Sequence, residues 1–137
     1  MVPNLCYPDV TAAVTWLCDT FGFREVLRWG PEENPAVQLV LGDGAIFVRG
    51  PREASPTAGA LRAPRDDGWS HTIMVSVDDV DRHYRRSVER GAEITLELQT
   101  YAFGERQYSA VDLGGHRWAF TQSVADVDPA DWGATVS

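Results

Sequence analysis

Residues 71–91 read HTIMVSVDDVDRHYRRSVERG, a strand pattern followed directly by a helix pattern. Apolar and polar side chains alternate over 72–77, which is typical of a strand with one buried face. Asp79 stands where a helix N-cap is expected, and Gly91 stands where the helix should end. The stretch therefore predicts a strand–helix unit.

The same pattern occurs earlier in the chain. Residues 7–22 read YPDVTAAVTWLCDTFG, with Asp9 as the expected N-cap and Gly22 at the expected helix end. Asp79 lies 70 positions after Asp9, and Gly91 lies 69 positions after Gly22. So little drift in the spacing predicts two copies of one structural unit.

Each predicted helix is followed by three strand-like runs separated by turn residues. These runs are 25–30, 36–41 and 45–49 in the first copy, and 93–99, 106–112 and 117–122 in the second. A single strand–helix–three-strand unit cannot bury both faces of its sheet, so we expect the two sheets to associate around a shared concavity. The predicted fold class is α+β, with two tandem βαβββ modules whose curved sheets enclose a cavity.

Between the copies, the chain is rich in Pro, Ala, Gly and Arg and shows no periodicity, which indicates a linker. A linker of this length lets the second module pair with its own first module or with that of a partner chain. Trp132, in an acidic tail, is expected to anchor against the body or a dimer partner. The expected parts of a single domain, 1–137, are a first module 1–50, a linker 51–69, a second module 70–123 and a tail 124–137.

Composition excludes several classes of function. The chain has 137 residues, 44% hydrophobic and 23% charged, which is typical of a globular domain. Its net charge of −8 argues against a nucleic-acid partner and suits a cationic small molecule. All twelve bases are arginine, so lysine Schiff-base chemistry is excluded. We expect no membrane span, a cytoplasmic location, and free buried thiols at Cys6 and Cys18.

Five segments resemble the vicinal oxygen chelate superfamily, which includes glyoxalases, extradiol dioxygenases and bleomycin-resistance proteins. The match covers nearly the whole chain apart from the linker and the tail. The resemblance implies the paired βαβββ fold, and it is closest to the glyoxalase/bleomycin resistance branch. The segments are YPDVTAA (7–13), FGF (21–23), HTIMVSVDDV (71–80), YAFGER (101–106) and DLGGHRW (112–118).

The resemblance also implies four positions where active members of the superfamily hold a divalent metal. His71 matches one of them. The repeat offset and the turn glycines place the other three at Met1 or Val2, at Val48 and at Ala119. One imidazole cannot hold a zinc, nickel or iron centre alone, so we expect neither a metal nor another cofactor.

Strand alternation assigns other side chains relative to these positions. Trp118 and Phe120 flank Ala119, so we expect them on the helix-covered face. By the same logic Phe47, beside Val48, should face the helix. Arg117 and Thr121 should share the face of Ala119 and look into the cavity, whereas His83 and His116 are expected at the surface.

The candidate ligand-binding residues combine aromatic rings with a few polar groups near the predicted cavity. The rings favour a stacking site for a planar or apolar ligand. Arg106 could hold a carboxylate or phosphate, or pair with Glu25 or Glu97. His71 is either a donor or base in the cavity or a remnant metal ligand. The candidates are Trp29, Gln38, Trp69, His71, Tyr101, Phe103, Arg106 and Tyr108.

These observations predict a metal-free homodimer that sequesters an antibiotic or an aromatic or apolar metabolite, in the manner of bleomycin-resistance proteins. Two alternatives stay open. One is a glyoxalase-like lyase or isomerase, or a dioxygenase, that either uses a metal or uses His71 as a general base. The other is a structural module with a collapsed cavity.

Overall fold

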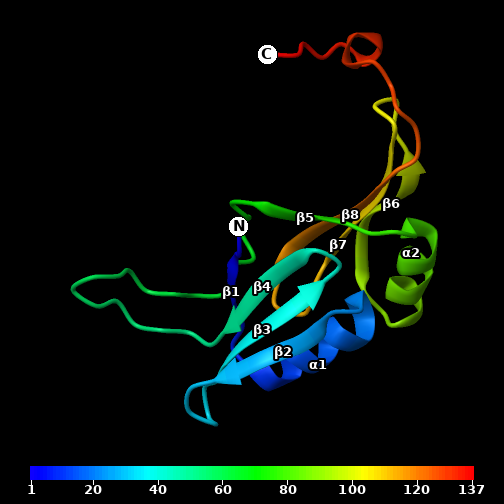
Figure 1. The fold of residues 1–137 in the computed structure, drawn as a ribbon. Coiled ribbons are helices and arrows are strands. Elements are labelled where there is room, and N and C mark those ends of the chain that lie inside the picture. Colours follow the sequence, from blue (N-terminus) through cyan, green and yellow to red (C-terminus); the bar gives the residue numbers. More distant parts are fainter.

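The computed structural model describes residues 1–137 and contains two four-stranded sheets, each covered on one side by a helix (Figure 1). This confirms the α+β class and the two tandem βαβββ modules. The first module comprises β1 (Asn4–Cys6), α1 (Val10–Phe21), β2 (Arg24–Trp29), β3 (Ala36–Leu41) and β4 (Gly44–Arg49). The second comprises β5 (Thr72–Ser76), α2 (Val80–Glu89), β6 (Glu93–Thr100), β7 (Glu105–Val111) and β8 (Arg117–Ser123), and a short 3₁₀ helix η1 (Pro129–Trp132) follows.

The two sheets have the same topology. Their strand orders are β1-β4-β3-β2 and β5-β8-β7-β6. In each sheet the first strand of the module pairs in parallel with the last, and the other pairs are antiparallel. The repeat in the sequence is therefore a repeat of the whole mixed sheet with its crossover helix.

Both helices begin where the sequence predicts. The carboxylate of Asp9 accepts a hydrogen bond from the main-chain N–H of Ala12, and that of Asp79 accepts one from Arg82, both at 2.9 Å. These bonds satisfy N–H groups that have no partner inside the helix. After α1 the chain turns at Gly22, whose φ of 80° suits a residue without a side chain.

The helix-covered faces of the two sheets meet in one hydrophobic core. Phe21 of α1 packs against Trp118 and Phe120 of β8, with ring centroids 5.7 and 4.7 Å apart. Both β8 rings are fully buried, as the alternation predicts. Because the covered faces pack together within one chain, the opposite faces of both sheets, called the open faces here, are turned away from the core.

Two histidines join the modules. The Nε2–H of His83 donates to the carbonyl of Phe21 at 2.8 Å, and that of His116 donates to the carbonyl of Cys6 at 2.9 Å. His116 is buried and His83 half-buried, so the expectation that both lie at the surface is wrong. Each imidazole satisfies a main-chain carbonyl of the first module that the junction would otherwise leave unpaired.

Two segments leave the body (Figure 1). Residues of the linker form a narrow arm, in which Arg52 bridges to Leu61 and Ser55 to Ala58. At the other end, Trp132 of η1 packs on Phe103, with ring centroids 5.6 Å apart. No helix is long and apolar enough to cross a membrane.

Candidate functional site

The open face of the first sheet carries an aromatic platform. Strand register places Leu27, Gln38, Phe47 and Asn4 in one row across the four strands. Beside this row, the ring of Trp29 meets Phe47 edge to face at 5.4 Å between centroids. Gln38 lies on the inner strand β3 rather than at an edge of the sheet. Its neighbours Val37 and Leu39 are buried in the core, so Gln38 is on the open face.

Arg49 completes this platform. Its guanidinium carbon lies 5.4 Å from the ring centre of Trp29 and 5.7 Å from that of Phe47. The Nε–H of Arg49 donates to Oδ1 of Asn4 at 2.9 Å, which fixes the guanidinium over the rings. A cation over aromatic faces is an attractive arrangement that also leaves N–H donors for a ligand.

The expected orientation of Phe47 and Val48 is wrong. Val48 is fully buried against α1, and Phe47 lies on the open face. The β3–β4 pairing ends at Leu41 and Gly44 and leaves a two-residue turn, whereas the β7–β8 pairing ends at Val111 and Arg117 and leaves five residues. Gly44 lies two residues before the core residue Ile46, whereas Gly115 lies three residues before the core residue Trp118. Aligning the two turn glycines therefore shifts β4 by one residue relative to β8 and reverses its faces.

The open face of the second sheet is built around β8. Its register with β5 and β7 places Arg117, Ala119 and Thr121 on this face, as predicted. The guanidinium carbon of Arg117 lies 4.4 Å from the ring centre of Trp69. Trp69 and Arg117 form part of the wall of a cavity of about 330 Å³ on this face, together with Thr72 and Leu96. Each open face therefore bears one arginine stacked on a tryptophan.

Arg106 and Tyr108 lie on the wrong face for the predicted site. Both face α2, where Arg106 makes a bidentate ion pair with Asp81 at 2.8 and 2.9 Å. Tyr108 is fully buried, and its hydroxyl lies 2.6 Å from Nδ1 of His83. Burial raises the pKa of Tyr108, which therefore stays protonated. The two residues share a face as expected, but the helix covers it.

Tyr101 and Phe103 belong to a separate cluster. Their rings stack at 5.2 Å between centroids in the loop between β6 and β7, and Trp132 of the tail covers Phe103. Neither ring lines a cavity with Trp29 or Trp69. Of the predicted ring set, the structure therefore places only these two tryptophans on open faces.

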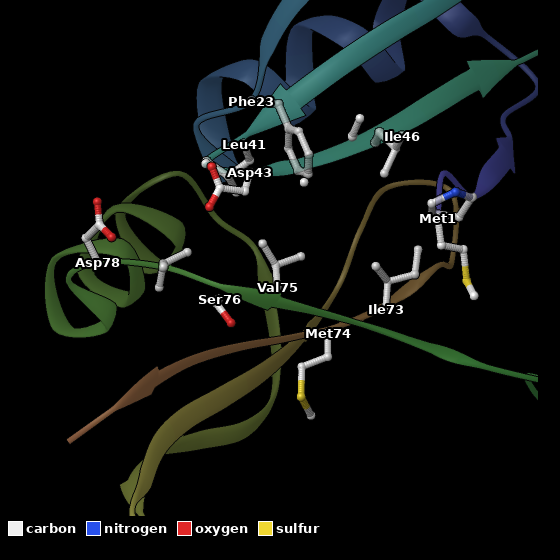
Figure 2. Close-up of a pocket in the computed structure, with 15 residues that line it drawn as sticks. Met1, Phe23, Leu41, Asp43, Ile46, Ile73, Met74, Val75, Ser76 and Asp78 are labelled. Atoms are coloured by element: carbon white, nitrogen blue, oxygen red, sulfur yellow. The ribbon is translucent and has the colours of Figure 1, made fainter. Parts of the chain in front are cut away.

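Another concave region lies between the modules (Figure 2). Phe23, Leu41 and Ile46 of the first module face Ile73 and Val75 of β5 across a groove of about 530 Å³. Its lining is mainly apolar. None of the candidate residues lines it, because the groove arises from packing between modules and no local pattern records that.

Comparison with known proteins fits this geometry. The family model of the Glyoxalase/Bleomycin resistance protein/Dioxygenase superfamily matches residues 3–120. The chain belongs to this superfamily.

Several known proteins align over most of the chain. TioX from Micromonospora sp. ML1 is 36% identical, covers 90% of this chain and 98% of its own, and superposes with a TM-score of 0.74. TnmS3, an antibiotic binding protein from Streptomyces sp. CB03234, shares the fold at 19% identity and a TM-score of 0.65, over 89% and 93% of the two chains. An uncharacterized protein of Mycobacterium bovis is 26% identical over 98% of this chain and 90% of its own.

The four-ligand metal set that the superfamily resemblance implies does not fit the residues present. His71 is exposed just before β5, and its Nδ1 lies 3.1 Å from the hydroxyl of Ser70. Val48 and Ala119 offer no donor, and the open-face neighbours of Val48 are Phe47 and Arg49. No three His, Cys, Asp or Glu side chains come close enough together to hold a metal ion.

Proposed function

We propose that this protein binds a planar aromatic or apolar small molecule without a metal, in the manner of bleomycin-resistance proteins, on the open faces of its sheets. The observation that carries the proposal is the stacked pair on each face, Arg49 with Trp29 and Arg117 with Trp69. A planar ligand can stack on either indole while its polar groups accept hydrogen bonds from the guanidinium.

The two tryptophans are available for such contacts. Trp29 is 37% exposed and Trp69 is 62% exposed. Both rings are nevertheless held in place, Trp29 by Phe47 and Arg49 and Trp69 by Arg117. Aromatic stacking contributes about 0.5–1.5 kcal/mol beyond the burial of area. Exposed indoles held by a neighbouring cation are thus suited to binding rather than to core packing.

A second copy of the chain would complete the site. Within one chain the helix-covered faces pack together, so the two open faces do not close on each other. Leu27 on the first sheet and Met74 and Leu96 on the second are 54%, 65% and 52% exposed. In a homodimer, the first open face of one copy can cover the second open face of the other and enclose two equivalent cavities.

The comparisons with known proteins also support the binding of a small molecule. TnmS3, which has the same fold, is an antibiotic binding protein. The poor fit of the metal-ligand positions also favours binding over metal-dependent turnover of the glyoxalase type.

Binding is tested by thermal shift and native mass spectrometry with a library of planar aromatic antibiotics. A ligand at 100 times its dissociation constant adds about 2.7 kcal/mol of stability. We expect Trp29→Leu and Trp69→Leu each to weaken a hit at least tenfold, whereas Trp132→Leu, in the tail cluster, should bind as the parent does. No hit in the library, or equal losses in all three variants, would contradict the proposal.

The homodimer is tested separately by light scattering after size exclusion. We expect twice the chain mass for the parent protein and a shift to the monomer for Leu27→Glu, which places a charge on the first open face. Val88→Glu is the matched control, because Val88 is 47% exposed on α2. A monomeric parent protein would rule out the shared cavity.

A further inference from the structure

The groove between the modules is separate from the open faces and has the character of a binding site of its own (Figure 2). Its volume of about 530 Å³ and its mainly apolar lining are typical of small-molecule sites. Phe23 and Ile46, which face it from the first module, are 5% and 3% exposed and belong to the core. The groove is therefore an open extension of the core surface.

The groove exists because two strand edges do not meet. β5 is the outermost strand of its sheet. On the other side of the groove, β1 pairs only with residues Phe47–Arg49 of β4. The first half of β4, Gly44–Ile46, therefore has no strand beside it on the side of β1. Apolar side chains from both modules line the gap between these two edges.

Half-buried side chains form the walls of the groove. Ile73 and Val75 of β5 pair in register with Trp118 and Phe120 of β8, so they lie on the helix-covered face and point into the groove (Figure 2). Leu41, at the end of β3, lines the groove from the other module. Because all three wall residues are only half-buried, part of their apolar surface is left for a ligand.

One end of the groove is acidic. Asp43 lies in the turn between β3 and β4, and Asp78 follows β5, and both line this end (Figure 2). The turn and the end of β5 come close together, since a Cβ at Gly42 would lie 3.9 Å from the carbonyl oxygen of Ser76. Neither carboxylate takes part in any ion pair of the chain.

No basic side chain lines the groove. Met1, with the α-amino group of the chain, lies at the end opposite to Asp78 (Figure 2). Arg82 lines a neighbouring hollow together with Asp78, but the two form no ion pair. The groove thus combines an apolar body with one end whose two negative charges have no partner in the protein.

We propose that this groove binds an amphipathic organic cation, an aliphatic chain that ends in a protonated amine. The chain packs between Leu41, Ile73 and Val75, and the ammonium group donates hydrogen bonds to the carboxylates of Asp43 and Asp78. An aliphatic amine keeps its proton at neutral pH, because its pKa is close to the value of about 10.4 for the lysine side chain. Burial of the chain favours binding, and hydrogen bonds between charged groups orient the ligand.

The first experiment is calorimetric titration of the full chain with octylammonium, 1-octanol, octanoate and butylammonium at neutral pH. We expect octylammonium to bind about tenfold more tightly than 1-octanol, which has no charge, and than butylammonium, which has a shorter chain. Octanoate should bind most weakly, because its carboxylate is repelled by the acidic end. Equal affinities for octylammonium and 1-octanol, or for octylammonium and butylammonium, would overturn the proposal.

The second experiment removes the two charges one at a time. Asp43→Asn and Asp78→Asn should each weaken octylammonium binding about fivefold and leave the affinity for 1-octanol unchanged. Asp66→Asn is the matched control, because it removes the same charge from an exposed position in the linker. An equal loss in Asp66→Asn would mean that only the overall charge of the chain attracts the amine, and the site would be wrong.

The third experiment separates this site from the open faces. Octylammonium has no ring to stack on Trp29 or Trp69, so Trp29→Leu and Trp69→Leu should bind it as the parent does, whatever the outcome with planar aromatic ligands. In NMR spectra of the parent, octylammonium should shift the methyl signals of Ile46 and Ile73 and leave those of Leu27, on the first open face, in place. The reverse pattern of shifts, or loss of binding in the tryptophan variants, would place the amine on the open faces and overturn the groove site.

Discussion

The hydroxyl of Tyr7 donates a hydrogen bond of 2.6 Å to Oδ2 of Asp112 and so joins the start of the first module to the last turn of the second. The Nε1–H of Trp118 donates to the same oxygen at 2.9 Å, and the main-chain N–H groups of Gly114 and His116 donate to Oδ1. Burial and the adjacent carboxylate raise the pKa of Tyr7, which keeps the hydroxyl protonated as a donor.

Removing this hydroxyl should destabilise the fold. In Tyr7→Phe the buried carboxylate of Asp112 loses one donor, and a hydrogen bond to a charged group contributes about 2 kcal/mol. Urea unfolding measures the change as a lower midpoint at an unchanged slope. Tyr101→Phe is the matched control, because the Tyr101 hydroxyl bonds an exposed Gln99 side chain and should cost less than about 0.5 kcal/mol. Equal effects in both variants would show that the junction does not depend on this bond.

Stability should depend on pH through His83. Burial lowers the pKa of this imidazole below the 6.5 of the unfolded chain. Below pH 6.5 the unfolded state therefore binds a proton that the folded state does not, and the free energy of unfolding falls as the pH drops until the folded pKa is passed. Above pH 6.5 His83 adds no pH dependence to the free energy of unfolding.

The pH effect is isolated by comparing unfolding free energies between pH 5 and 8 in two variants. His83→Gln should be less stable than the parent at pH 8 and should show a smaller loss on acidification. His71→Gln alters an exposed imidazole and should reproduce the parent profile. A parent-like pH profile in His83→Gln would assign the slope to other groups.

Gly114 should not tolerate a side chain. A Cβ at this position would lie 2.5 Å from Cδ1 and 2.7 Å from Cε1 of Tyr7, whose ring is fully buried. Forcing these atoms apart costs about 1–3 kcal/mol. Gly114→Ala should therefore lower the unfolding midpoint, whereas Gly59→Ala, with open space around its position, should leave it nearly unchanged. Wild-type stability of Gly114→Ala would mean that the turn moves freely.

The two faces of β4 should respond differently to truncation. Val48→Ala removes buried methyl groups and should cost about 2 kcal/mol of stability without changing the open face. Phe47→Ala should cost less than about 1 kcal/mol, because Phe47 is half-buried, yet it should weaken any ligand that stacks on Trp29. Paired denaturation and binding measurements on both variants check this. A large loss of stability in Phe47→Ala together with weaker ligand binding in Val48→Ala would contradict this. It would mean that Phe47 faces the helix and Val48 the open face, as the repeat offset predicts.

Much of the fold follows from local patterns. Asp9 and Asp79 mark helix starts because their carboxylates satisfy free N–H groups, and that chemistry needs no distant partner. The strand bounds also agree with the alternation to within one or two residues. Trp118 and Phe120 lie in the core as predicted, because alternation along β8 puts them on the face opposite to Ala119.

The site was harder to predict, because alternation separates two faces without saying which one a helix covers. Tyr108 and Arg106 have the right mutual spacing, and α2 covers both of them. His83 and His116 look like surface residues in a polar helix and a turn, but each pairs with a carbonyl of the other module. The Trp29–Arg49 and Trp69–Arg117 stacks join residues too distant in sequence for any pattern to connect.

The unequal turns that end β3 and β7 have a consequence for how the two halves of the chain can diverge. Equivalent positions counted from the turn glycines are not equivalent in space along β4 and β8. A mutation copied from one half to the other by that count therefore exchanges an interior site for an exterior one.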